Sequence, residues 1–454
     1  MRRLLAMLLA GGMACAADGR YPDVATTDRD GIWIFRGSAQ GDYAGGTFHF
    51  IGASVEPWHI CVADLNGDAL PDLVSSNRLG PSVSVFLNTG DAFEGPFDYF
   101  GGGEPYAAAA GDFDSDGDLD LAVANPEASG ALVLLENQGG GTFAQMAVLT
   151  PGNATYAVEC ADVDANGTTD LVVVNDDSED LVVLLGNGAG AFVESGRYAT
   201  ERSPKSLALG RFNGDALPDV AVINYDSATV SSYVNTGGGT FEYVASYAVG
   251  VLPRHAVARD FDGDGTDDLV VACGRGSEEV AVLFGLGGGR FAPAEAYYTG
   301  PRPNAVAVAD ADADGRLDIF AANWSLDAEQ FACVSLLGNA GGRQFAKRLD
   351  FKPAAGFPKL TFVAAGYFTA SLFIRGDANG DGRVNLSDAI RSLYYVFGLS
   401  QVACADAVDA NDDGAADIAD PIYVLEYLFG SGPPPAPPFP RPGADPTPDN
   451  LTCR

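Results

Sequence analysis

The sequence predicts an all-β fold of seven similar units closed into a ring, followed by a small α-helical segment. An acidic pattern recurs six times, with its first positions 48, 50, 49, 49 and 50 residues apart. Such a period is typical of an array of like units. Each repeat holds four short apolar segments separated by glycine-rich turns. Four short strands per unit, without a helix, are the pattern of a β-propeller blade.

The fourth repeat illustrates the strands of one unit. We expect them over 205–212, 219–224, 229–234 and 241–249, because apolar runs of this length bounded by glycine, asparagine and aspartate indicate strands. The acidic pattern falls between the first and second strands and therefore forms a loop.

A second repeated feature gives the number of blades. A glycine-rich hairpin ends in phenylalanine seven times, at Phe48, Phe93, Phe143, Phe192, Phe241, Phe291 and Phe345. The extra copy, within 20–50, supplies strands two to four of a blade, and 358–368 supplies a first strand without an acidic loop. Joining the two pieces closes the ring and leaves no free sheet edge. We therefore predict seven blades, with six as the alternative.

The acidic loops carry oxygen side chains at positions one, three, five and nine. The candidate metal ligands are Asp64, Asn66, Asp68 and Asp72; Asp112, Asp114, Asp116 and Asp120; Asp162, Asp164, Asn166 and Asp170; Asn213, Asp215 and Asp219; Asp260, Asp262, Asp264 and Asp268; and Asp310, Asp312, Asp314 and Asp318. Oxygen ligands converging in a tight loop favour Ca²⁺. The alternative is a polar turn that caps a hairpin without an ion.

These loops resemble the FG-GAP/VCBS repeat family, whose propeller occurs in integrin α-subunits, and the resemblance covers roughly residues 20–370. It implies Ca²⁺ between strands one and two of each blade that has a loop. The fourth copy departs from the pattern, because Arg211 replaces the first aspartate. We expect that site to be weak or empty, which leaves about five structural calcium sites in the propeller.

Residues 375–431 form a second predicted calcium module. Two twelve-residue loops carry Asp377, Asn379, Asp381, Asn385 and Asp388, and Asp409, Asn411, Asp413, Asp417 and Asp420. They match the EF-hand loop except for aspartate at position twelve. Helices are expected over 389–397 and 421–429. With no helix before either loop, the module resembles a type I dockerin, which implies a cohesin-like or surface-scaffold partner. The alternative is a self-contained calcium cap, because positions 386–387 and 418–419 depart from the usual serine/threonine pair.

The N-terminal residues indicate export. Residues 1–16 have the basic start, short apolar run and small-residue end of a signal peptide. The propeller is expected over 17–374, and a proline-rich tail over 432–454. Export permits disulfides, and Cys404 with Cys453 is the favoured pair. Lipidation of Cys15 is the alternative to cleavage.

The charge balance limits the possible partners. A formal net charge of −35 disfavours nucleic acids and anionic membranes, and no later stretch of about 20 apolar residues predicts a membrane span. We expect a secreted or cell-surface protein.

A ligand site is predicted at one end of the channel. In the propellers that this chain resembles, ligands meet the face opposite the acidic loops, where each first strand begins. Trp58, Tyr106, Tyr156, Lys205, Arg254 and Asn304 occupy these positions. Aromatic and basic groups together suggest an anionic or sugar-like ligand. The alternative is a set of solvated residues that bind nothing.

The functional prediction is an extracellular binding or adhesion module for a protein or glycan. One alternative is a polysaccharide lyase, for which His59 or His255 would be the base; no other catalytic residue is predicted, because the three histidines lie in no known catalytic motif. The other alternative is a purely structural matrix or surface-layer protein.

Overall fold

The computed structural model describes residues 21–38, 43, 46–90, 92–126, 130–274, 276–324, 333–351, 362–366, 378, 384, 386–397, 408–411, 415–429 and 434–435. The chain divides into two compact units, the larger over Tyr21–Phe368 and the smaller from Thr369 to Arg454. The predicted signal peptide and the Cys404–Cys453 pair lie outside the described residues.

The larger unit contains seven four-stranded antiparallel sheets, which we call blades. Blade 1 contains β4 (Pro57–Ala63), β5 (Asp72–Asn77), β6 (Ser82–Asn88) and β7 (Phe93–Phe100), and blade 2 contains β8 (Ala107–Gly111), β9 (Asp120–Ala124), β10 (Leu132–Asn137) and β11 (Phe143–Leu149). Blade 3 contains β12 (Thr155–Ala161), β13 (Asp170–Asn175), β14 (Asp180–Gly186) and β15 (Phe192–Ala199), and blade 4 contains β16 (Pro204–Gly210), β17 (Asp219–Asn224), β18 (Thr229–Asn235) and β19 (Phe241–Ala248).

The last two full blades follow the same order. Blade 5 contains β20 (Pro253–Arg259), β21 (Asp268–Cys273), β22 (Glu279–Leu283) and β25 (Glu295–Tyr298), with a short extra hairpin of β23 (Gly285–Gly287) and β24 (Arg290–Phe291). Blade 6 contains β26 (Pro303–Ala309), β27 (Asp318–Asn323), β28 (Cys333–Gly341) and β29 (Gln344–Phe351). The strands β16 to β19 of blade 4 confirm the four strands expected in the fourth repeat. Their ends differ from the expected ones by no more than two residues.

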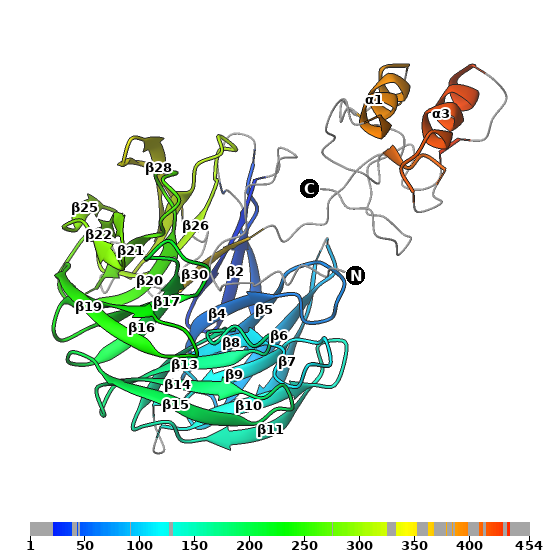
Figure 1. The fold of residues 1–454 in the computed structure, drawn as a ribbon. Coiled ribbons are helices and arrows are strands. Elements are labelled where there is room, and N and C mark those ends of the chain that lie inside the picture. Colours follow the sequence, from blue (N-terminus) through cyan, green and yellow to red (C-terminus); the bar gives the residue numbers. More distant parts are fainter. Residues whose placement is uncertain are drawn as a thin grey trace. The chain divides into compact units, whose positions relative to one another are not determined.

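The seventh blade is built from both ends of the propeller sequence, as predicted. The strands β1 (Asp23–Thr27), β2 (Gly31–Phe35) and β3 (Thr47–Phe50) pair in order, and β30 (Val363–Gly366) adds to β1 as the innermost strand. In Figure 1 the olive β30 lies beside the blue strands of the N-terminal part. Because β30 contacts both β4 and β26, the ring of innermost strands closes. The prediction of seven blades is confirmed.

The core lies between consecutive blades and follows the two-residue period of a strand. In β13, Leu171 and Val173 pack toward blade 2, whereas Val172 and Val174 pack toward blade 4. Both faces of the middle strands are buried, which explains why their sequences are continuous apolar runs.

Asparagine side chains also link neighbouring blades. Asn137 donates to the Leu65 carbonyl at 2.8 Å and Asn235 to the Val163 carbonyl at 2.8 Å. Asn339 donates to the Phe261 carbonyl at 3.0 Å. These bonds join blades 1 and 2, 3 and 4, and 5 and 6, each through an acidic loop of the first blade in the pair.

The smaller unit contains the two expected helices, α1 (Leu386–Val396) and α3 (Ala419–Phe429). Each begins two or three residues before the predicted start, so Asp388 and Asp420 lie in a first turn, where a carboxylate is favoured. The helices contact each other, and Ala389, Ala410 and Val424 form their buried core. None of the helices in the described parts of the chain has the length and apolarity that a membrane crossing requires.

Candidate functional site

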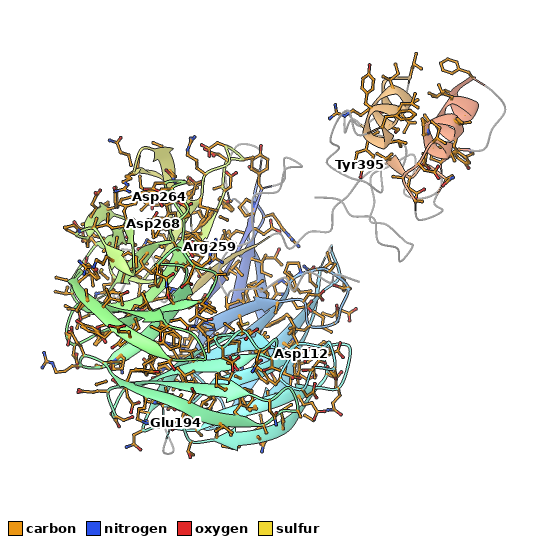
Figure 2. The ribbon with its side chains drawn as sticks, in the orientation of Figure 1. Asp112, Glu194, Arg259, Asp264, Asp268 and Tyr395 are labelled. Carbon is orange, nitrogen blue, oxygen red and sulfur yellow. The ribbon has the colours of Figure 1, made fainter. Side chains whose placement is uncertain are left out.

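The six acidic loops connect the first and second strands of blades 1 to 6, as the sequence predicted; we number them one to six. Figure 2 labels Asp112 of loop two and Asp264 and Asp268 of loop five. Four loops bring three carboxylates to one point, with ligand atoms within 4.8 Å of one another. These sets are Asp112, Asp114 and Asp120; Asp162, Asp164 and Asp170; Asp260, Asp262 and Asp268; and Asp310, Asp312 and Asp318.

The first aspartate organises the turn in five of the loops. In loop one, Asp64 accepts the backbone N–H groups of Gly67 at 2.8 Å and Ala69 at 2.9 Å. The loops take left-handed backbone conformations at positions four and six, as at Ser115 and Gly117. A polar turn without an ion would make these hydrogen bonds too. However, such a turn does not require three carboxylates to converge, and this convergence suits a divalent cation.

The ninth aspartate fastens the loop to its own blade. Asp120 accepts the N–H of Phe113 at 2.9 Å and that of Asn137, at the end of β10, at 2.7 Å. All six loops repeat this pair of bonds, including loop four through Asp219. The ninth aspartate therefore has a structural role that does not depend on a metal, which the sequence analysis missed.

Loop four differs from the others in its backbone and in its charge. It has a left-handed conformation at Gly214 but not at Ala216, the sixth position. The Arg211 guanidinium lies 4.0 Å from Asp267 of the next blade. Among the described residues Arg211 makes no ion pair with its own loop, so it does not take the cation's place there. The ligands that remain are Asn213, Asp215 and Asp219.

Guanidinium groups instead contact two other loops. Arg343 lies 2.6 Å from Asp262 and 3.7 Å from Asp264 in loop five, and Arg316 pairs with Asp314 in loop six. Burial, together with the carboxylates of Asp262 and Asp260, raises the pKa of Asp268 to about 7, although hydrogen bonds from the Gly285 and Phe261 N–H groups oppose the rise. The arginine contacts and the raised pKa of Asp268 both indicate that negative charge is concentrated in these loops, which suits a cation.

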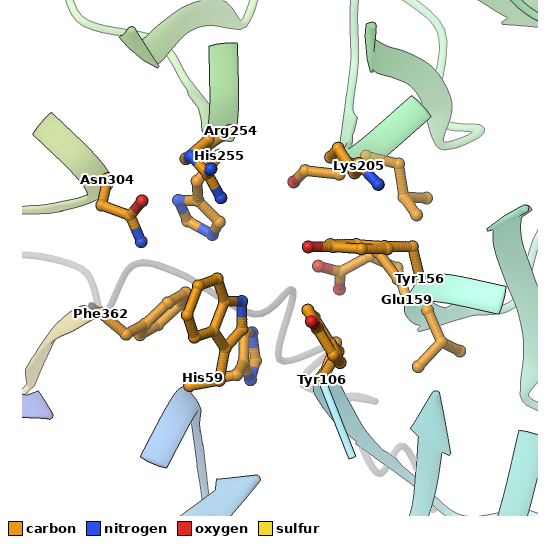
Figure 3. Close-up of a pocket in the computed structure, with 15 residues that line it drawn as sticks. His59, Tyr106, Tyr156, Glu159, Lys205, Arg254, His255, Asn304 and Phe362 are labelled. Atoms are coloured by element: carbon orange, nitrogen blue, oxygen red, sulfur yellow. The ribbon is translucent and has the colours of Figure 1, made fainter. Parts of the chain in front are cut away.

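The six predicted rim residues line one pocket at the channel. Trp58, Tyr106, Tyr156, Lys205, Arg254 and Asn304 come from six consecutive blades and surround a cavity of about 50 Å³. Five of them are labelled in Figure 3, where their side chains converge. The innermost strands all start at this end of the ring, which explains the convergence.

The aromatic rings form a continuous arc along one side of the pocket. The centroids of Trp58 and Tyr106 are 5.4 Å apart, and those of Tyr106 and Tyr156 are 4.6 Å apart. Lys205 continues the arc, with its Nζ 4.0 Å from the Tyr156 ring centroid. Arg78 lies over Trp58 at 5.3 Å. The rings are tilted to one another and offer apolar faces beside cationic groups.

The deeper part of the pocket contains residues that the rim pattern did not predict. His59 and His255 pack on Phe362, with ring centroids 4.3 and 4.8 Å from it. Burial lowers the pKa of His59 to about 3 and that of His255 to about 4, so both rings are neutral. Glu159 of β12 also reaches the pocket. The sequence contains a signal that could have identified Glu159. The positions equivalent to it in blades 1, 2, 4, 5 and 6 are Cys61, Ala109, Ala208, Val257 and Ala307, none of which is an acidic or basic residue.

The C-terminal calcium ligands are described only in part. Asp377, Asn379, Asp381, Asn385 and Asp413 lie outside the described residues, so the structure does not test their arrangement. Asp388, Asp409 and Asp420 are fully buried. Asp420 accepts the N–H of Asp417 at 2.7 Å and that of Asn411 at 3.5 Å. These contacts hold the second loop against the start of α3.

Comparisons with solved structures show the same fold in proteins of low sequence identity. A protein from Lactobacillus plantarum is 14% identical with a TM-score of 0.57, and a periplasmic gluconolactonase from Pseudomonas aeruginosa is 14% identical with a TM-score of 0.56; each match covers 76% of this chain and 99% of the other. A lectin from Burkholderia pseudomallei is 16% identical, with a TM-score of 0.51 and coverage of 73% and 99%. No curated protein matches the sequence.

The repeats themselves match a known sequence family. The profile of the FG-GAP-like repeat matches residues 18–75, 112–173, 162–222, 211–271 and 260–321, which together make up more than half of the chain. The matched segments contain all six acidic loops whole. The chain therefore belongs to the FG-GAP-like repeat family.

Proposed function

We propose that this chain is an exported, calcium-binding propeller that binds an extracellular glycan or protein ligand at its channel pocket. The observation that carries the proposal is the convergence of three aromatic rings and two basic groups on one cavity. Aromatic faces stack on sugars or on apolar side chains, and basic groups attract anions. The basic start and apolar run of residues 1–16 support export.

Calcium has a structural role in this proposal. Four loops gather three carboxylates each, and a bound cation would offset their mutual repulsion. Loop one would bind through Asp64, Asn66 and Asp72, which makes about five sites with loop four excluded. Modules that work outside cells bind Ca²⁺ with dissociation constants of roughly 10⁻⁴ to 10⁻³ M.

The smaller unit would attach the protein to a surface partner. Exposed apolar residues occur at equivalent positions in or directly beside the two helices, 32 residues apart: Leu386 and Ile418, Ile390 and Ile422, and Phe397 and Phe429. Such a duplicated apolar face suits docking to a protein scaffold. Replacing Ile390 and Ile422 together by aspartate should release the full chain from the surface of the producing cell. Unchanged attachment would rule out this role for the helices.

A glycan array probed with the full chain, with and without calcium, tests the main proposal. A ligand found there should be lost when Trp58, Tyr106 and Arg254 are all replaced by alanine. A control variant with alanine at the exposed Tyr243 of β19, outside the pocket, should bind as the wild type does. Retention of the ligand by the triple variant would contradict the proposal. A purely structural protein would give no ligand in any arm.

The two histidines of the pocket do not support catalysis. His59 and His255, the candidate bases, have pKa values lowered to about 3 and about 4 by burial. A general base works best with a pKa near the working pH. The likeness to a gluconolactonase concerns the fold alone, because the identity is 14%.

A further inference from the structure

Glu159 borders two cavities of the propeller. It belongs to β12 and borders the pocket that contains Lys205 and Arg254. It also borders a second cavity, of about 170 Å³, which contains Cys61 and Cys160. Figure 3 shows its carboxyl group directed into the same space as the Tyr156 hydroxyl. No hydrogen bond to this carboxyl group is formed by any residue that the structure describes.

The positive charge available to a ligand comes mainly from Arg254. Lys205 is paired with Asp176, and Arg78 lies 2.7 Å from Glu56. Arg254 is held by a neutral residue, Tyr225, whose hydroxyl accepts a hydrogen bond at 3.1 Å and whose ring lies 4.8 Å away. Within the described ranges Arg254 has no carboxylate partner. An anion entering the pocket would therefore meet a guanidinium that is positioned but not neutralised.

Burial keeps Glu159 uncharged at neutral pH. Desolvation raises its pKa to about 8, and the positive charge of Arg259 on β20 opposes that rise. The titratable and charged groups around it are His59 and Cys61 on β4, Tyr106 before β8, Tyr156 and Cys160 on its own strand, Lys205 on β16 with its partner Asp176, and Arg254, His255 and Arg259 on β20; Asp112 and Asp162 border the second cavity alone. His59 and His255 are neutral, so the pocket carries a net positive charge.

We infer that Glu159 determines specificity by donating a hydrogen bond to the carboxylate of an acidic sugar, while Arg254 supplies the positive charge. The inference rests on the proposed function, because it names the ligand class of the same pocket. The aromatic arc would stack against the sugar ring. The cavity of about 50 Å³ is too small to enclose a whole sugar, so a terminal residue would enter with its acidic group first.

The pH dependence of binding separates this role from simple attraction to Arg254. We would measure binding of sodium D-glucuronate to the full calcium-loaded chain by calorimetry, with D-glucose as the neutral control. Glucuronate should bind more tightly than glucose at about pH 6 and lose about tenfold in affinity by about pH 9, where Glu159 has become ionised. Glu159→Gln keeps a donor that does not titrate, so it should bind at both pH values. Glu242→Gln, on the outer strand β19, should behave as the wild type.

The outcomes separate this inference from the proposed function. If Glu159→Gln shows the same loss of affinity at high pH as the wild type, Glu159 is not the donor and the inference fails. It also fails if choline, a permanent cation, binds more tightly than glucuronate, because the pocket would then be a cation site. If a neutral glycan from the array binds and the triple variant loses it, the inference fails while the proposed function stands.

Discussion

Single charged residues set the properties of both candidate sites. Arg211 interrupts loop four, and Glu159 is the acidic side chain among the described residues that line the pocket. Each occupies a position whose equivalents in other blades carry a different charge. Their effects can be measured one residue at a time, because the surrounding blades repeat the same architecture.

Restoring an acid in loop four should create a calcium site. Arg211→Asp returns the first acid that the other five loops share, and Ala216→Gly supplies the glycine that loops two, three, five and six have at the left-handed sixth position. We expect the number of bound calcium ions, measured by equilibrium dialysis, to rise by one. The control is Arg290→Asp in β24, a similar change of charge outside the loops, which should leave the number unchanged. If the number of bound calcium ions does not rise in the loop-four variant, acidic residues in this pattern are insufficient for calcium binding.

The stability of the protein should depend on pH through Glu159. Burial raises its pKa to about 8 from an ordinary value of 4.5, so its contribution to stability is present below the unfolded pKa and is lost as the pH rises through the folded pKa. Glu159→Gln should therefore melt at a higher temperature than the wild type near pH 9, and the difference should shrink near pH 4. A difference that stays constant between these pH values would contradict the assignment.

At the scale of the element, each acidic loop combines a local turn with a fastening to its blade. The first aspartate shapes the turn, and the ninth joins it to the end of the third strand. Positions one, three and nine then present carboxylates together in four of the loops. The two roles can be separated in loop four. Asp219 there still accepts the two backbone N–H groups, although the first acid is replaced by arginine.

Two aspartate variants should distinguish fastening from metal binding. Asp219→Ala in loop four removes the acceptor of two buried backbone N–H groups, and we expect a loss of roughly 2–4 kcal/mol with or without calcium. Asp114→Asn in loop two should destabilise the protein only when calcium is present. Chemical denaturation in calcium and in EDTA measures both. Equal effects of Asp114→Asn in the two conditions would argue against a calcium site.

Removal of calcium should lower the melting temperature of the whole propeller. A site saturated at about 100 times its dissociation constant contributes about 2.7 kcal/mol, and several such sites approach the net stability of an ordinary domain. Calorimetry in excess calcium and after EDTA treatment tests this. A melting curve that EDTA does not move would favour polar turns over metal sites.

At the scale of the whole molecule, stability depends on closing the ring with β30. This strand pairs with β1, more than 300 residues away in sequence, and contacts the first strands of blades 1 and 6. Val363 is fully buried in the cluster that joins the composite blade to its neighbours. Each innermost strand is an edge of its sheet, and closure of the ring places these short edges around the channel, where they are protected from a partner chain.

Disrupting β30 should therefore open the propeller. Val363→Asp places an unpaired charge in this buried cluster, and we expect a loss of at least 3 kcal/mol together with faster proteolysis. Val193→Asp, at an exposed position of the outer strand β15, is the matched control and should change stability by less than about 0.5 kcal/mol. Equal effects of the two substitutions would show that closure by β30 contributes little.

The sequence by itself determined the features that repeat. The 49-residue spacing, the split blade, the loop positions and the six rim residues all follow from comparing one repeat with the next, because each blade uses the same short-range pattern. Only the tertiary structure decided which groups meet across blades: Arg343 on loop five, Arg254 on Tyr225, and the carboxyl group of Glu159 in the channel. These contacts join residues whose separation along the chain is arbitrary. They depend on side-chain direction and on closure of the ring, and neither of these produces a repeating pattern in the sequence.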